Sequence, residues 1–220
     1  MRTVRFAAIC LTILAMLGAA GCQKSYYFNF TVERDLLRSD GNWITWNDQY
    51  ELSAKGLLMN DCFIMAPHFY EGDVEVILRF GLDVEPGSSG ADIDFSLYSP
   101  TETDSECGIT ISFRKLGTAE EAYYISHYGD MQADLLVPFS APIPGLLNGQ
   151  INVIRIVRKL GRFYFYMNDE PVATNLDATY YTSDLGCLTM LCHQDPMEEQ
   201  VLIKDVKIIY EGERFLWGDL

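Results

Sequence analysis

The sequence predicts an all-β domain built as a sandwich of two antiparallel sheets. Segments that alternate apolar and polar residues recur along the chain, and such segments form strands with one buried and one wet face. Turn-forming stretches such as "EPGSSG" at 85–90 separate them, and no segment keeps a helical period. About a dozen short strands of this kind indicate a jelly roll, in which two sheets cover each other's apolar faces.

The clearest strands lie in the middle of the chain. Residues 74–80 place apolar side chains at even positions, whereas 92–97 and 109–114 place them at odd positions. The segments "LGCLTMLC" at 185–192 and "VLIKDVKIIY" at 201–210 are predicted to be the last two strands. Nearer the N-terminus, "TVERDLLRSDG" offers at most one helical turn.

Residues 150–169, "QINVIRIVRKLGRFYFYMND", predict a β-hairpin that turns at Leu160-Gly161. Counting outward from the turn sets residues opposite each other in pairs: Ile156 with Phe165 and Ile154 with Met167 on the core face, and Val157 with Tyr164 and Arg155 with Tyr166 on the outer face. The aromatic residues at 163–166 therefore alternate between the core face and the outer face of one strand. Asn168 to Pro171 supplies the next turn.

Residues 1–21 are predicted to be a signal peptide that is removed from the mature chain. Arg2 and Arg5 precede an apolar core at 6–17, which is shorter than the roughly 20 residues that a membrane span needs. The stretch ends in "LGAAGC", which resembles the lipobox of bacterial lipoproteins, where cleavage leaves a lipid-modified cysteine, here Cys22. Ordinary signal cleavage beside an incidental cysteine is the alternative. If the lipoprotein rule applies, Gln23 favours anchoring to the outer membrane, so the protein is expected to be exported to the cell envelope.

Residues 22–26 are predicted to form a lipid-anchored tether and residues 27–220 a single domain. The chain carries 16 basic and 31 acidic residues, and removing the leader takes two arginines and no acid, which leaves a net charge of −17. Such a charge repels phosphate backbones, so nucleic acid is excluded as a partner. It also repels anionic lipid, so a covalent anchor is the expected link to a membrane.

Four cysteines lie in the mature part of the chain: Cys62, Cys107, Cys187 and Cys192. An exported protein meets oxidising conditions, so one or two disulfides are expected, and the three full pairings stay open. Cys187 and Cys192 would point to opposite faces of one strand, which argues against a bond between them. Buried free thiols are the alternative.

The order of these signals from Trp43 to Tyr210 resembles the concanavalin A-like lectin and glucanase domains. The matching segments are Gly56-Leu57-Leu58, Gly72 to Val76 with Arg79-Phe80, the hairpin residues Asn152, Ile154, Ile156, Arg158, Gly161, Tyr166 and Asn168, then Gly186 to Leu188, and Val201 to Ile208. The strand order also resembles the 3-keto-disaccharide hydrolase family, although the "L-F-N-G-x-x-L-x-x-W" start of that family is missing around 35–46. The resemblance implies a jelly roll that hosts lectins, glycosidases and adhesion modules alike.

The glucanases of this superfamily carry three carboxylates at alternate positions of one strand, as in E-[IL]-D-[IFV]-x-E. In "DIDFS" the corresponding positions hold Asp92, Asp94 and Ser96. Glycoside hydrolysis needs two carboxyl groups with separate roles, and a serine cannot serve as the titrating acid. The glucanase motif is therefore absent in its standard form.

Other chemical signatures are missing from the sequence. The three histidines do not have zinc-site spacing, and there is no nucleophile elbow or phosphate-binding glycine loop. Calcium is an option only at the oxygen-rich group Asp83, Glu85, Asp92 and Asp94. No other cofactor is expected.

One polar sheet face is the expected binding surface. The strand parities gather on it the residues Arg79, Asp92, Asp94, Tyr98, Thr110, Ser112, Arg114, Arg155, Tyr164 and Tyr166. Tyr164 and Tyr166 would stack on sugar rings, and Arg114 and Arg155 with the two aspartates would bind hydroxyl groups. Arg79 is a further candidate for carbohydrate binding. The alternative is an ordinary solvent-exposed sheet face that carries charged residues and tyrosines and binds no ligand.

The leading functional hypothesis is an envelope lipoprotein that binds carbohydrate. The second is a glycoside-cleaving enzyme whose acid comes from a loop carboxylate that the sequence does not identify. The third is a structural or protein-interaction module without catalytic activity. A flat tyrosine-lined face favours the first, and two carboxylates in one cleft favour the second.

Overall fold

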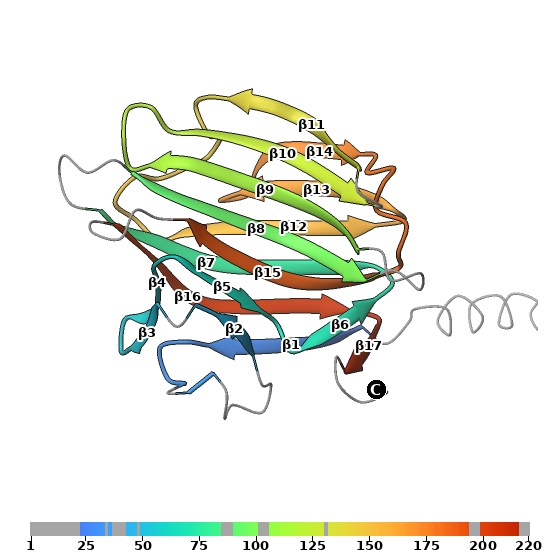
Figure 1. Ribbon diagram of the computed structural model, residues 1–220, viewed down its shortest axis with the longest axis horizontal. Coiled ribbons are helices and arrows are strands. Elements are labelled where there is room, and N and C mark those ends of the chain that lie inside the picture. The colour runs from blue at the N-terminus through green and yellow to red at the C-terminus, as the bar shows by residue number, and fades with distance from the viewer. Residues whose placement is uncertain are drawn as a thin grey trace, which may run out of the picture.

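The computed structural model describes residues 23–33, 35–36, 43–47, 49–84, 90–100, 106–129, 132–193 and 199–215. It confirms an all-β sandwich of two antiparallel sheets, which Figure 1 shows one in front of the other. No residue of these ranges is helical, and accordingly none of them belongs to a helix that could cross a membrane. The predicted signal peptide lies outside the described residues.

The first sheet has eight strands. Its order is β14 (Glu170–Leu176), β13 (Arg162–Met167), β12 (Asn152–Lys159), β7 (Val74–Val84), β16 (Glu199–Tyr210), β4 (Gly56–Met59) and β3 (Tyr50–Ser53), with β1 (Lys24–Asn29) also paired to β16.

The second sheet has nine strands. Its order is β11 (Gln132–Ser140), β10 (Ala122–Gly129), β9 (Glu106–Leu116), β8 (Ala91–Pro100), β15 (Leu185–His193), β5 (Cys62–Met65) and β2 (Ile44–Trp46), while β6 (His68–Glu71) pairs with β15 and with β17 (Gly212–Phe215). The chain crosses repeatedly between the sheets, and among these crossings β7 and β8 enter different sheets, as do β11 and β12.

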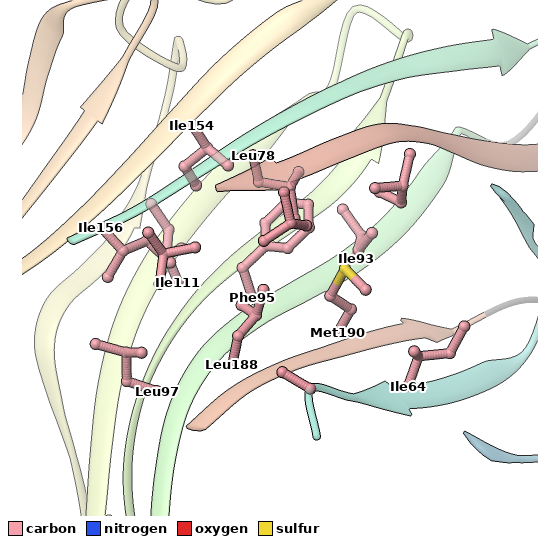
Figure 2. Packing of buried hydrophobic residues seen from close by; sticks show 14 of the residues in the cluster. Ile64, Leu78, Ile93, Phe95, Leu97, Ile111, Ile154, Ile156, Leu188 and Met190 are labelled. Carbon is pink, nitrogen blue, oxygen red and sulfur yellow. The ribbon is translucent and has the colours of Figure 1, made fainter. Parts of the chain in front are cut away.

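The core fills the space between the two sheets. Leu78 and Ile154 come from the eight-stranded sheet, and Ile93, Phe95 and Met190 face them from the nine-stranded sheet (Figure 2). All five side chains are at most 1% exposed. Burying one such side chain contributes about 1.5–3 kcal/mol, so this alternating apolar set is the main stabilising term of the fold.

The predicted hairpin is confirmed in its register. Strands β12 and β13 pair Ile156 with Phe165 and Arg155 with Tyr166, as the count outward from the turn requires. Leu160 and Gly161 have φ angles of 51° and 71°, the combination that a type I′ turn needs. The turn therefore fixes which side chains of both strands point outward.

Several edge strands differ from the prediction. Strand β1 begins at Lys24, inside the segment predicted to be a tether, because its pairing with β16 lets Phe28 pack into the core. Strand β17 follows the segment predicted to be the last strand. The four cysteines of the described chain are buried, and no disulfide joins them in this structure.

Candidate functional site

The predicted binding surface is divided between the two sheets. Arg79, Arg155, Tyr164 and Tyr166 lie on the eight-stranded sheet, whereas Asp92, Asp94 and Arg114, with Tyr98, Thr110 and Ser112, lie on the nine-stranded sheet. All point away from the core, so the two groups face opposite sides of the sandwich. The prediction of a single face was wrong because alternation tells which residues point outward but not which sheet their strand joins.

Two surfaces result, and each has its own geometry. The hollow face consists of the outward side chains of β7, β12, β13 and β16. The ion-pair face consists of the outward side chains of β8, β9, β10 and β15.

The hollow face takes its name from a depression of about 480 Å³ at one end of its strands. The residues that line it are Gln23, Asp73, Val74, Glu75, Arg155, Val157, Arg158, Lys159, Tyr164, Tyr166 and Ile209. A volume of this size lies within the range of small-ligand sites. It includes Arg155, Tyr164 and Tyr166 of the predicted site, but not Arg79.

Arg155 lines the hollow beside Tyr166 and Glu75. Its guanidinium carbon lies 4.3 Å from the centroid of the Tyr166 ring, a cation–π contact. Its Nε lies 3.4 Å from Glu75 Oε1. Both charged side chains keep about a third of their surface exposed, at 36% and 31%, so they can exchange water for a ligand. Tyr164 and Tyr166 are half-buried on the same face.

The rim of the hollow is held by the β12–β13 turn. The backbone N–H of Leu160 donates to Asp73 Oδ1 at 2.7 Å, which ties the turn to the start of β7. Arg158 lies behind the rim and is 4% exposed. It donates to the carbonyl oxygens of Leu185 at 2.6 Å and of Gly72 at 3.0 Å, and it also contacts Asp184. These bonds tie the end of β12 to the backbone at residues 72 and 184–185.

The arrangement suits a ligand that has both apolar and polar edges. Val157 and Ile209 supply apolar floor, and the two tyrosines supply flat rings. The charged groups of Arg155 and Glu75 stand beside them. Sugars present C–H faces for the first kind of contact and hydroxyl groups for the second.

Arg79 lies elsewhere on the hollow face. It binds Asp205 through its Nε at 2.9 Å and through a terminal nitrogen. Asp205 is 5% exposed and also accepts from the Tyr27 hydroxyl at 3.4 Å. Arg79 therefore compensates a buried carboxylate and does not line the hollow.

The ion-pair face is built around Arg114. Its Nη1 donates to Asp94 Oδ1 at 2.7 Å, its Nη2 donates to the Tyr124 hydroxyl at 2.7 Å, and its Nε lies 3.6 Å from Asp92 Oδ2. His193 Nε2 lies 3.1 Å from the other oxygen of Asp94. The charged groups satisfy one another, so neither aspartate is held apart as a free carboxylate.

Aromatic pairs flank this network, and the sequence reasoning missed them. The rings of Tyr124 and Phe139 are 4.5 Å apart, and those of Trp46 and Phe63 are 5.0 Å apart. Phe139 and Trp46 are 65% and 58% exposed. Alternation in 122–129, with Tyr124, Ser126 and Tyr128 on one side, was the available signal for the first pair.

The described residues hold no group of three or more His, Cys, Asp or Glu side chains placed to bind a metal. Of the residues named for calcium, Asp92 and Asp94 contact Arg114. Glu85 and the side chain of Asp83 lie outside the described part of the chain.

Comparisons with known proteins identify the fold. A comparison with protein-family models finds no match, and neither does a comparison with curated protein sequences. Among solved structures, the metal-free Emp46p carbohydrate recognition domain matches with a TM-score of 0.62 and 14% identity over 84% of this chain and 95% of that one. The Crh5 transglycosylase in complex with NAG matches with 0.57 and 13% over 86% and 84%.

A third structure, an immunostimulatory antigen and pseudo β-1,3-glucanase of Mycobacterium tuberculosis, matches with a TM-score of 0.60 and 9% identity over 85% of this chain and 98% of that one. The fold is thus the concanavalin A-like jelly roll that the sequence resemblance predicted. At these identities the likeness establishes the fold alone. The Emp46p domain also occurs in a potassium-bound form.

Proposed function

We propose that this protein is a carbohydrate-binding domain and that the hollow is its binding site. The observation that carries the proposal is the combination of Tyr164, Tyr166 and the Arg155–Glu75 pair around one open volume of about 480 Å³. A mono- or disaccharide unit would stack on the tyrosines and exchange hydroxyl hydrogen bonds with Arg155 and Glu75.

The structural neighbours support this proposal because their names describe carbohydrate-related functions. One is a carbohydrate recognition domain, one is a transglycosylase in complex with NAG, and one is a pseudo-glucanase. Carbohydrate is the ligand class that the names of these three proteins share. Because this fold also serves other functions, the chemistry of the hollow carries the argument for this chain.

The position of the hollow further defines the expected ligand. Gln23 lines it, and β1 begins at the next residue. If the mature chain is anchored to the outer membrane through Cys22, as the leader predicts, the hollow opens within a few ångströms of the anchor point. The ligand is then a glycan of the cell envelope that lies close to the membrane surface.

The hydrolase alternative finds less support in the hollow. Its carboxylates are Asp73 and Glu75, and the first accepts the Leu160 N–H while the second faces the Arg155 guanidinium. Glycoside cleavage needs two carboxyl groups with separate roles, and Asp73 is already occupied by the backbone of the turn. Binding without cleavage is therefore the function we propose.

A glycan and polysaccharide array tests the proposal. The chain from Gln23 contains every described strand, and we expect it to bind at least one envelope glycan, with equal signal in calcium and in chelator. Release of reducing sugar from the bound glycan would support the hydrolase instead. No binding to any glycan would overturn the proposal and favour the structural module.

A further inference from the structure

The structure brings two of the four cysteines together. In the antiparallel ladder between β5 and β15, Cys62 stands directly opposite Cys192. Both side chains point into the core and are at most 1% exposed. They follow the pair Ile64 and Met190, which are labelled in Figure 2, on the same side of the ladder.

This geometry is compatible with a disulfide. Residues directly opposite each other in an antiparallel pair have Cα atoms about 4.5–5.5 Å apart. Disulfide-bonded residues have Cα atoms about 4.4–6.8 Å apart. A bond between Cys62 and Cys192 therefore needs rotation of the side chains but no movement of the strands.

Neither Cys187 nor Cys107 stands opposite another cysteine in the ladders of its strand. Cys187 on β15 pairs with Tyr98 of β8, and Cys107 lies on β9 on the far side of β8. Two strand spacings separate these two strands, about 9.6 Å, which exceeds the roughly 7 Å limit for a disulfide. Cys187 is also five residues along the strand from Cys192, roughly 17 Å. The open choice among pairings thus reduces to one bond.

We propose that Cys62 and Cys192 form the single disulfide of this domain, by exchange with a small-molecule or protein disulfide during folding. The thiolate of one cysteine attacks the oxidant's disulfide, which forms a mixed disulfide and releases one thiol of the oxidant. The thiolate of the other cysteine then attacks the mixed disulfide and releases the second thiol. Two electrons and two protons pass to the oxidant, and Cys107 and Cys187 stay reduced.

The bond has to form before the sandwich closes. Burial raises the pKa of the Cys62 thiol to about 11 and that of Cys192 to about 12. Only the thiolate exchanges with disulfides, and in the closed fold both groups are protonated and covered. Oxidation is therefore a folding event and not a switch of the native protein.

The bond would secure a weakly held part of the nine-stranded sheet. Strand β5 joins β15 through a four-residue ladder and carries β2 on its other edge. These two strands present Phe63 and Trp46. A cross-link at Cys62–Cys192 also restricts the unfolded chain across a loop of more than a hundred residues, which is a further source of stability.

Peptide mass mapping tests the proposal directly. The chain from Gln23 is folded in a buffer of oxidised and reduced glutathione, denatured, alkylated and digested. We expect one cross-linked peptide pair that contains Cys62 and Cys192, with Cys107 and Cys187 alkylated. Four alkylated cysteines, or any other cross-linked pair, would overturn the proposal.

A matched pair of variants measures the effect on stability. The oxidised chain should melt roughly 5–10 °C above the same chain in a reductant that breaks the bond. Cys62→Ala/Cys192→Ala should abolish this difference, whereas Cys107→Ala/Cys187→Ala should keep it. The opposite pattern would contradict the assignment. If either variant fails to fold, the mapping of the unaltered chain still decides.

Discussion

The two outer faces carry the same kinds of side chain and use them differently. On the ion-pair face, Arg114 binds Asp94 and Tyr124, so its charge is already compensated. On the hollow face, Arg155 and Glu75 stand at the edge of an open volume and remain about a third exposed. The first set stabilises the sheet, and the second is available to a ligand.

The comparison shows that residue types alone do not identify a binding face. An arginine beside a tyrosine and a carboxylate occurs on both sides of this sandwich. The hollow lies where the β12–β13 turn is tied to the start of β7 through the Leu160 N–H and Asp73, and Arg155 lines the same hollow. A binding site on this fold therefore depends on the shape of the sheet face as well as on the residue types that its strands present.

The largest effect is expected at Arg158, which supports the hollow from within. Replacement by Met leaves the buried carbonyl groups of Gly72 and Leu185 without their donor, so Arg158→Met should lower the free energy of unfolding by about 3 kcal/mol. Urea denaturation measures it. Lys159→Met, one residue further and exposed, is the control and should change stability by less than about 0.5 kcal/mol. Equal effects of the two changes would contradict the support role.

A pair of arginine variants separates the two faces. Arg114→Met should lower the free energy of unfolding by about 2 kcal/mol, because it leaves Asp94 partly buried without its guanidinium, and it should leave glycan binding unchanged. Arg155→Met should weaken glycan binding about tenfold and lower stability by less than about 1 kcal/mol. Calorimetry and urea denaturation measure both quantities. Exchanged results would mean that the ion-pair face is the binding face.

A smaller effect is expected from acid, and it concerns the nine-stranded sheet. Burial lowers the pKa of His127 below its usual 6.5, and burial also lowers that of His68. His127 lies on β10 and His68 on β6, and both strands belong to the nine-stranded sheet. Because the unfolded chain binds these protons more readily, stability is complete above about pH 6.5 and falls as the pH drops through that value towards the folded pKa values.

His127→Phe keeps the ring that stacks on Tyr180 at 4.4 Å and removes the titration. Melting temperatures between pH 7.5 and 5 should therefore fall less steeply in this variant than in the unaltered chain. An unchanged slope would exclude His127 as a source of the acid effect.

The hairpin shows how much of the fold could be predicted. Its register followed from the Leu160-Gly161 turn, and the structure pairs Arg155 with Tyr166 as expected. Two neighbouring strands joined by a short turn constrain each other, so local sequence suffices. The core-facing residues of β7, β8 and β9 followed from alternation in the same way.

What could not be predicted is how distant strands combine. Alternation within a strand tells which of its residues point outward. It does not tell which sheet the strand joins, so it could not predict that β7 and β8 enter different sheets. Strands β2 to β6 have three or four residues each, too few to display a period. Tyr164 and Tyr166 were correctly predicted to point outward. They lie on the opposite side of the sandwich from Asp92 and Asp94 because their strands join different sheets.

One measurement tests the central claim most directly. Binding of the glycan selected by the array is measured by calorimetry for the unaltered chain and for two double variants, Tyr164→Ala/Tyr166→Ala on the hollow face and Tyr124→Ala/Phe139→Ala on the ion-pair face. Melting temperatures confirm that each is folded. Losing two stacking rings should weaken binding about 30-fold in the first variant and less than about twofold in the second. A loss confined to the second variant would contradict the hollow as the binding site.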